Sequence, residues 1–171
     1  YGKETAFFCT NDAQTEPLLK QIAKYGGIFV EPDLPSPLMG YPGALGIDLS
    51  AEAGDFPAIM KKVEQAVIDA GGKGRMGTWS YSFGWSTVCA LAEYGKRITE
   101  GEAKLYRLKD LWACYDKYTP GAQWMGSEYL DMATQVKMRN FLLVYQDTYI
   151  FGKGYMDITK VQVPEKFMTI K

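Results

Sequence analysis

The sequence predicts an α/β fold in which crossover helices flank a parallel sheet. Between residues 5 and 101, short apolar runs alternate with longer segments whose apolar residues recur at helical spacing. This alternation is typical of parallel strands that are joined by helices. The segment that begins at residue 105 has a different character and is treated as an extension of this lobe.

Three strands are expected at apolar runs near residues 5–10, 27–30 and 75–80. Short apolar runs between turn signals fit buried strands. The carboxyl ends of parallel strands lie at the same edge of a sheet, where such folds bind ligands. We therefore expect the residues that follow the three strands to share one crevice.

Three helices are expected near residues 16–25, 55–70 and 85–99. Pro17 suits the first turn of a helix, where its missing N–H group is not needed. Asp55 is a good N-cap for the second helix, which has the clearest amphipathic pattern in the sequence. Glycine pairs follow the first two helices and are expected to end them.

Residues 31–46 contain four prolines and predict a long rigid loop. A loop of this length in a compact domain is usually functional. It is the most distinctive segment of the sequence outside the expected helices and strands.

The C-terminal part is predicted to be mostly helical. Residues 108–115 are amphipathic, and the apolar residues from Ser127 to Tyr145 predict a helix or a broken helix. Residues 140–155 fit a helix or a strand because their apolar residues run continuously, and we favour a helix there. The tail, residues 161–171, is expected to be extended or loose. The predicted domains are an α/β ligand-binding lobe, 1–104, and a helical extension packed on it, 105–171.

Composition and charge narrow the range of functions. The chain has 171 residues, enough for one core, and a net charge of -1. Such a charge gives no reason to expect nucleic acid or an anionic membrane as partner. The longest uncharged stretch, 76–92, is too polar to span a bilayer. Because the chain begins at Tyr1 rather than Met, we expect a processed or partial chain, so a missing leader says nothing about compartment.

The absence of histidine excludes the commonest catalytic systems. The chain has no His and three cysteines, Cys9, Cys89 and Cys114, none of them in a CxxC pair. Ser-His-Asp, Cys-His and HExxH sites are therefore excluded. We expect buried, inert thiols, above all at Cys9, and we predict neither an enzyme, nor a transition-metal centre, nor a cofactor.

Polar and aromatic side chains follow the expected strands. Asn11 and Asp12 follow the first strand, where both could contact a ligand. Alternatively, Asp12 caps the next helix and Asn11 only turns the chain. Aromatic residues alternate with Ser and Gly after the third strand, where core packing explains them less well. We predict one pocket for a small ligand with flat and hydrogen-bonding groups. Its residues are Asn11, Asp12, Ser36, Tyr41, Trp79, Tyr81, Ser82 and Trp85.

Acidic residues leave less favoured alternatives open. Asp12 with Glu16, or Asp33 with Asp48, could form an acid–base pair, but loop carboxylates are more often solvated or capping. Oxygens of Asp12, Glu31 and Asp33 could bind Ca²⁺ or Mg²⁺, although their spacing matches no known loop. A structural protein that uses its aromatic residues in an interface is a further alternative.

Two segments of the chain resemble a family of bacterial lipoproteins of unknown function. They are residues 5–47, which read TAFFCTNDAQ…GALGI, and residues 151–157, which read FGKGYMD. That family is similar to the type I periplasmic-binding-protein fold, which sugar-binding proteins and LacI-type effector domains share. Asn11 and Asp12 match a recurrent ligand-contact position of this superfamily. Residues 98–104, ITEGEAK, resemble the end of its crossover helix.

The resemblance implies a solute-binding or sensing module of an exported lipoprotein, located in the periplasm or at the cell surface. It also implies that an N-terminal lobe is missing from this chain, because type I binding proteins have two lobes. The alternative is the effector-binding domain of a LacI-like transcriptional regulator, which would be cytoplasmic. That version requires an upstream helix-turn-helix, which this chain does not show.

Overall fold

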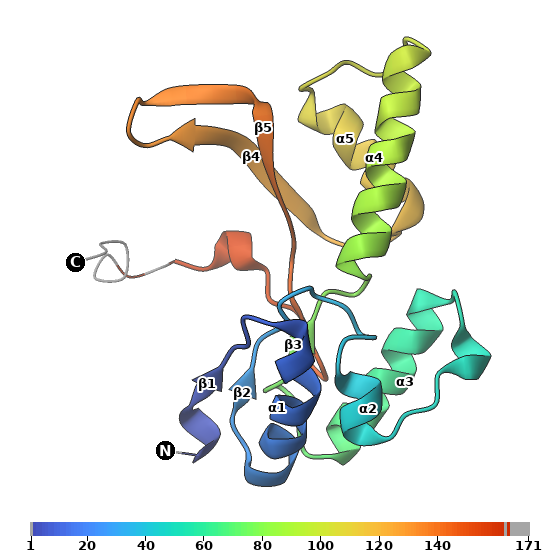
Figure 1. The fold of residues 1–171 in the computed structure, drawn as a ribbon, viewed down its shortest axis with the longest axis vertical. Coiled ribbons are helices and arrows are strands. Elements are labelled where there is room, and N and C mark those ends of the chain that lie inside the picture. The colour runs from blue at the N-terminus through green and yellow to red at the C-terminus, as the bar shows by residue number, and fades with distance from the viewer. Residues whose placement is uncertain (1, 163, 165–171) are drawn as a thin grey trace.

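The computed structural model describes residues 2–162 and 164 (Figure 1). The elements in chain order are η1 (Gly2–Glu4), β1 (Ala6–Phe7), α1 (Asp12–Tyr25), β2 (Ile28–Phe29), α2 (Tyr41–Leu45), η2 (Ser50–Glu52), α3 (Phe56–Asp69), β3 (Gly77–Thr78), α4 (Phe83–Thr99), α5 (Leu108–Tyr118), β4 (Trp124–Asp131), β5 (Val136–Gln146), β6 (Tyr149–Ile150), β7 (Gly154–Tyr155) and η3 (Ile158–Lys160).

The predicted fold class, a parallel-sheet lobe of the periplasmic-binding-protein type, is wrong. Among the described strands, only β1 and β2 form a parallel ladder, and one isolated parallel bridge joins Phe29 to Met76. The other sheets are antiparallel, with strand orders β3-β6-β7 and β4-β5. The partner of β3, the strand β6, comes from a distant part of the sequence. A local apolar run does not indicate whether its partner strand is parallel or antiparallel to it.

The prediction of a mostly helical extension is also wrong. α5 lies where a helix was expected, but β4 and β5 form an antiparallel hairpin with an irregularity between Glu128 and Tyr129. The continuous apolar run of β5 fits either structure, and cross-strand pairing with β4 decides for a strand. Of the tail that was expected to be extended, residues 163 and 165–171 lie outside the described residues.

The helices at the three N-terminal positions are confirmed. α1 begins four residues earlier than expected, because its N-cap is Asn11 and not Asp12, the cap expected from the sequence. Asn11 Oδ1 accepts a hydrogen bond from Ala13 N at 2.9 Å. Asp55 caps α3, as predicted, by accepting from Ala58 N at 3.0 Å. Caps and apolar periodicity are local signals, so the sequence encodes these helices directly.

Side chains pack into two separate hydrophobic clusters. The first cluster joins β2, α1, α2, α3 and the Phe151 ring, and includes the buried Cys9. Tyr41 is fully buried there, and its hydroxyl donates to Gly77 O at 2.6 Å. The second cluster joins α4, α5 and the β4–β5 hairpin, and includes the buried Cys114. Figure 1 shows the two groups of elements in the lower and upper halves of the molecule.

The chain passes between the clusters twice, at residues 79–82 and at residues 146–148. The fully buried Gln146 ties the two passages together: its Oε1 accepts from Ser80 N at 2.8 Å, Ser80 Oγ at 3.0 Å and Tyr81 N at 3.3 Å. Phe83 N donates to Pro35 O at 2.9 Å, so the proline loop also reaches this junction. No helix within residues 2–162 and 164 is both long and apolar enough to cross a membrane.

Candidate functional site: an aromatic groove

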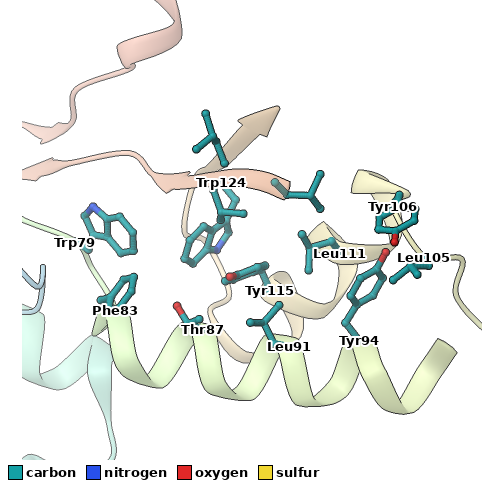
Figure 2. A pocket seen from close by; sticks show the side chains of 13 residues that line it. Trp79, Phe83, Thr87, Leu91, Tyr94, Leu105, Tyr106, Leu111, Tyr115 and Trp124 are labelled. Carbon is teal, nitrogen blue, oxygen red and sulfur yellow. The ribbon is translucent and has the colours of Figure 1, made fainter. Parts of the chain in front are cut away.

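A groove of about 520 Å³ lies between α4, α5 and the β4–β5 hairpin (Figure 2). We call it the aromatic groove. Among the described residues, those that line it are aromatic, aliphatic or threonine, and none is charged. The wall consists of Trp79, Phe83, Thr87, Leu91, Tyr94, Leu105, Tyr106, Leu111, Tyr115, Trp124, Leu142, Leu143 and Val144.

Helical periodicity brings the wall together. Phe83, Thr87, Leu91 and Tyr94 recur three or four residues apart along α4, so their side chains share one face, as Figure 2 shows. Leu111 and Tyr115 are four residues apart on α5 and face the same space. β5 closes the third side of the groove through Leu142 and Val144.

Two of the hydrogen-bonding side chains in the wall, Tyr94 and Trp124, have partners within the protein. The Tyr94 hydroxyl donates to Lys104 O at 2.8 Å, and Trp124 Nε1 donates to Thr119 Oγ1 at 2.9 Å. Burial raises the pKa of Tyr115, and the neighbouring Thr87 side chain opposes that shift. The groove therefore offers mainly ring faces and aliphatic surface.

Trp79 forms one end of the groove and is only 5% exposed. Its ring makes edge contacts with Trp124 and Tyr145 at centroid distances of 5.6 and 5.7 Å, and a tilted contact with Phe83 at 5.9 Å. Trp79 Nε1 is buried and has no acceptor at hydrogen-bond distance among the described residues. Buried indole N–H groups usually have a partner, so this one is a polar feature at an otherwise apolar end.

Glu31 lies near Trp79, just after β2. Thr148 Oγ1 donates to Glu31 Oε2 at 2.7 Å, and the Tyr145 hydroxyl lies 3.5 Å from the same oxygen. Burial raises the pKa of Glu31, and the charge of Asp147 adds to that shift. The hydroxyls of Thr148 and Tyr145 favour the charged form of Glu31, as does the nearby Trp79 N–H, which lies beyond hydrogen-bond distance. Among the described residues, no Lys or Arg pairs with Glu31.

The predicted site residues near α1 have mainly structural surroundings. Asn11 is exposed and caps α1, and Asp12 follows it with Oδ1 buried and without a partner among the described residues. Ser36 is buried, with Oγ accepting from Leu38 N at 3.1 Å. Tyr41 lies inside the first cluster. Their contact with a ligand stays a prediction.

The aromatic residues predicted for the site are divided between cavities. Tyr81 and Trp85 share a second hollow of about 300 Å³ beside Phe56, whereas Trp79 lines the aromatic groove. Ser82 precedes α4 as its N-cap residue, without a side-chain capping bond. The structure thus brings Tyr81 and Trp85 together but does not join all eight residues in one of these cavities.

Sequence reasoning missed the parts of the groove that come from α5 and the hairpin. Leu111 and Tyr115 belong to an amphipathic pattern that was recognised only as a helix face, and Trp124 was not considered. Glu31 was considered only as a metal ligand. Its position directly after an expected strand was the signal that could have pointed to the ligand site.

The alternatives built on acidic residues gain no support. No three His, Cys, Asp or Glu side chains in the described part of the chain lie close enough together to hold a metal ion. Glu16 pairs with Lys20 at 2.6 Å, and Asp48 accepts from Ser50 N at 2.9 Å. Both carboxylates thus have local partners.

Comparison with solved structures shows that the fold is shared with part of a larger protein. A solved chain from Clostridium difficile 630, named as a candidate transcriptional regulator, superposes with a TM-score of 0.70 at 18% identity. The match covers 88% of this chain and 42% of that one. At this identity the likeness shows the fold alone.

Sequence comparison identifies the family. Residues 1–77 match the profile of a family described as "Protein of unknown function (DUF3798)", and residues 88–170 match a second family profile that has no description. An uncharacterized protein of Treponema pallidum (strain Nichols) is 32% identical over 79 residues, which cover 46% of this chain and 89% of the relative. The chain belongs to the same family of uncharacterized proteins as this relative.

A second uncharacterized Treponema pallidum protein is 38% identical over 76 residues, which are 44% of this chain. The match spans only 33% of that relative. The sequence-based expectation of a family of unknown function is thus confirmed, whereas the lipoprotein character that was expected with it is not.

Proposed function

We propose that this chain is a binding module for a small molecule whose flat, apolar part occupies the aromatic groove. The observation that carries the proposal is a groove of about 520 Å³ with an aromatic wall and no charged lining residue among those described. Ligand pockets typically measure about 300–1,000 Å³ and are mostly apolar, with few polar groups.

The wall supplies the binding energy that such a ligand needs. Each well-placed aromatic contact contributes about 0.5–1.5 kcal/mol beyond the burial of area. Because the wall is mostly aromatic and aliphatic, it has few polar groups that an apolar ligand could leave unpaired. A ligand with many hydrogen-bonding groups in the groove would lose its contacts with water and gain little in return.

A second candidate is the effector-binding part of a transcriptional regulator. Its support is the shared fold with the Clostridium difficile protein that is named as a candidate regulator. Both candidates require a ligand and differ in what its binding controls, and one fold can serve many functions. Location separates them: an exported lipoprotein would appear in the membrane or periplasmic fraction of the cell, and a regulator in the cytoplasm.

We also propose that a further lobe of the same protein covers the ligand. The support is the length of the relatives, since the matched part is 42% of the solved chain and 33% of one Treponema protein. A second lobe would exclude water from a groove that is open in this chain, and this would strengthen binding.

A groove-filling substitution tests the proposed site. Thr87 lines the groove, whereas its neighbour Val88 is 69% exposed and does not line it. In fluorescence titrations with Nile red, an uncharged flat dye, we expect Thr87→Trp to weaken binding at least tenfold and Val88→Trp to leave it unchanged. Melting temperatures of both variants show whether each is folded. No binding to the unchanged protein, or equal losses in the two folded variants, would refute the site.

A further inference from the structure

We propose that Glu31 gives this module a preference for organic cations, by binding the ammonium group of a ligand whose flat part stacks at the Trp79 end of the aromatic groove. This inference rests on the proposed function and adds the chemical class of the ligand. It is carried by the contacts of Glu31, by the rings beside it and by the charge around it.

The Glu31 carboxylate has hydrogen-bond donors but no cationic partner among the described residues. Thr148 Oγ1 and the Tyr145 hydroxyl both approach Oε2, at 2.7 and 3.5 Å. The salt bridges of the described part of the chain all involve other carboxylates, such as Glu93 and Asp110. Partly buried carboxylates are usually paired, so an unpaired one at a strand end is a candidate binding group.

Aromatic rings adjoin this carboxylate. Trp79 and Tyr145 meet edge to face at 5.7 Å with an interplanar angle of 86°. The Tyr145 hydroxyl lies 3.5 Å from Glu31 Oε2, and the Trp79 N–H is near the carboxylate but beyond hydrogen-bond distance. A cation close to such rings is attracted by their negative faces, most strongly by Trp. Since Trp79 also lines the groove, one side chain borders both the apolar space and the carboxylate.

The surrounding charge favours a cation over an anion. The nearby Asp147 is fully buried and accepts hydrogen bonds from Asp157 N at 2.7 Å and Ile158 N at 3.3 Å. Its charge acts on Glu31 with the same sign, so a cation would relieve the repulsion between the two carboxylates. The aromatic neighbours, and the lack of a third metal-binding side chain in the described residues, favour an organic cation over a metal ion.

A pair of probes with the same flat body tests this preference. We would titrate 2-(1-naphthyl)ethylamine, which is cationic at neutral pH, and 2-(1-naphthyl)ethanol, which is not, into the protein by calorimetry. A hydrogen bond to a charged group corresponds to about a tenfold difference in affinity or more. We expect the amine to bind the unchanged protein about tenfold more tightly, and Glu31→Gln to bind both probes equally.

Glu102→Gln is the matched control, because Glu102 is an exposed carboxylate without the Thr148 and Tyr145 contacts that mark Glu31. It should keep the tenfold preference. If neither probe binds the unchanged protein, the proposed function itself fails. If both probes bind it equally, or if Glu31→Gln keeps the full preference, the proposed function stands and this inference is overturned. Binding of 2-(1-naphthyl)ethanol shows that the Glu31→Gln variant is folded. If this variant does not bind the alcohol, Glu31→Ala is tested in its place, and we again expect equal binding of both probes.

Discussion

At the scale of the residue, the surroundings of a side chain assign its role better than its type does. The sequence analysis predicted Tyr41 and Trp79 as residues of the same ligand site near the strand ends. Tyr41 is fully buried in the first cluster, whereas Trp79 lines the aromatic groove. In the sequence, Glu31 was one of several acidic residues in loops. In the structure it differs from the others because it accepts a hydrogen bond from the hydroxyl of Thr148, which is 117 residues later in the chain.

Tyr41→Phe separates a structural role from a binding role. The change removes the hydroxyl that donates to Gly77 O in the buried cluster. An unpaired buried acceptor costs about 1–3 kcal/mol, so we expect the free energy of unfolding in urea to fall by that amount. Nile red affinity should not change. Tyr25→Phe, at a position that is 65% exposed, should leave both quantities unchanged. If Tyr41→Phe weakened dye binding without lowering the stability, Tyr41 would be a ligand-binding residue and the structural role would be refuted.

At the scale of the element, a charged cluster links α4 to α5 behind the groove. Glu93 on α4 accepts from Arg97 Nε at 2.8 Å on the same helix and pairs with Lys117 Nζ at 2.9 Å on α5. Hydrogen bonds from Lys117 and then Arg97 lower the pKa of Glu93 to about 2. The second cluster therefore includes an ion pair between its helices as well as apolar contacts.

This cluster predicts a loss of stability in acid. A carboxyl group whose pKa is lower in the folded state stabilises that state above its ordinary pKa of 4.5, and the contribution disappears as the pH falls towards 2. The free energy of unfolding should thus fall more steeply over this range in the unchanged protein than in Glu93→Gln. Glu100→Gln removes a carboxylate whose pair with Lys96 is long, 3.8 Å, and exposed, and should keep the steep slope. Parallel slopes for Glu93→Gln and the unchanged protein would contradict the prediction.

At the scale of the whole molecule, two clusters are held together by few polar contacts. Gln146 accepts three hydrogen bonds from Ser80 and Tyr81, and these join the two passages of the chain. The aromatic groove lies on one side of this junction, with Trp79 at its end. The relative position of the clusters therefore determines how Trp79 meets both Glu31 and the groove.

Gln146→Ala should destabilise the protein as a whole. It leaves the buried N–H of Tyr81 and the partly buried N–H of Ser80 without their acceptor, at a cost of up to about 1–3 kcal/mol for each group left unpaired. We expect a lower midpoint of urea unfolding, measured by tryptophan fluorescence, and weaker Nile red binding. Gln123→Ala changes an exposed side chain in the loop before β4 and should have no such effect. An unchanged midpoint in Gln146→Ala would show that the junction does not depend on this side chain.

The sequence by itself determined the parts of the fold that depend on local signals. Caps at Asn11 and Asp55 and apolar residues at helical spacing encode α1, α3 and α4, because a helix forms its hydrogen bonds within one segment. The missing histidine equally excluded whole classes of catalytic site. The contact of Trp79 with Phe83, four residues later, was within reach of the sequence, but Tyr81 and Trp85 line another hollow.

Only the tertiary structure decided the strand partners and the groove. A strand forms its hydrogen bonds with another segment, so the apolar run of β5 could not show that it pairs with β4, nor could β3 show that its neighbour is the antiparallel β6. Tyr115, Trp124 and Val144 come from three elements and meet Trp79 only after these pairings form. A cavity is a relation between elements that are distant in sequence, and no local pattern contains it.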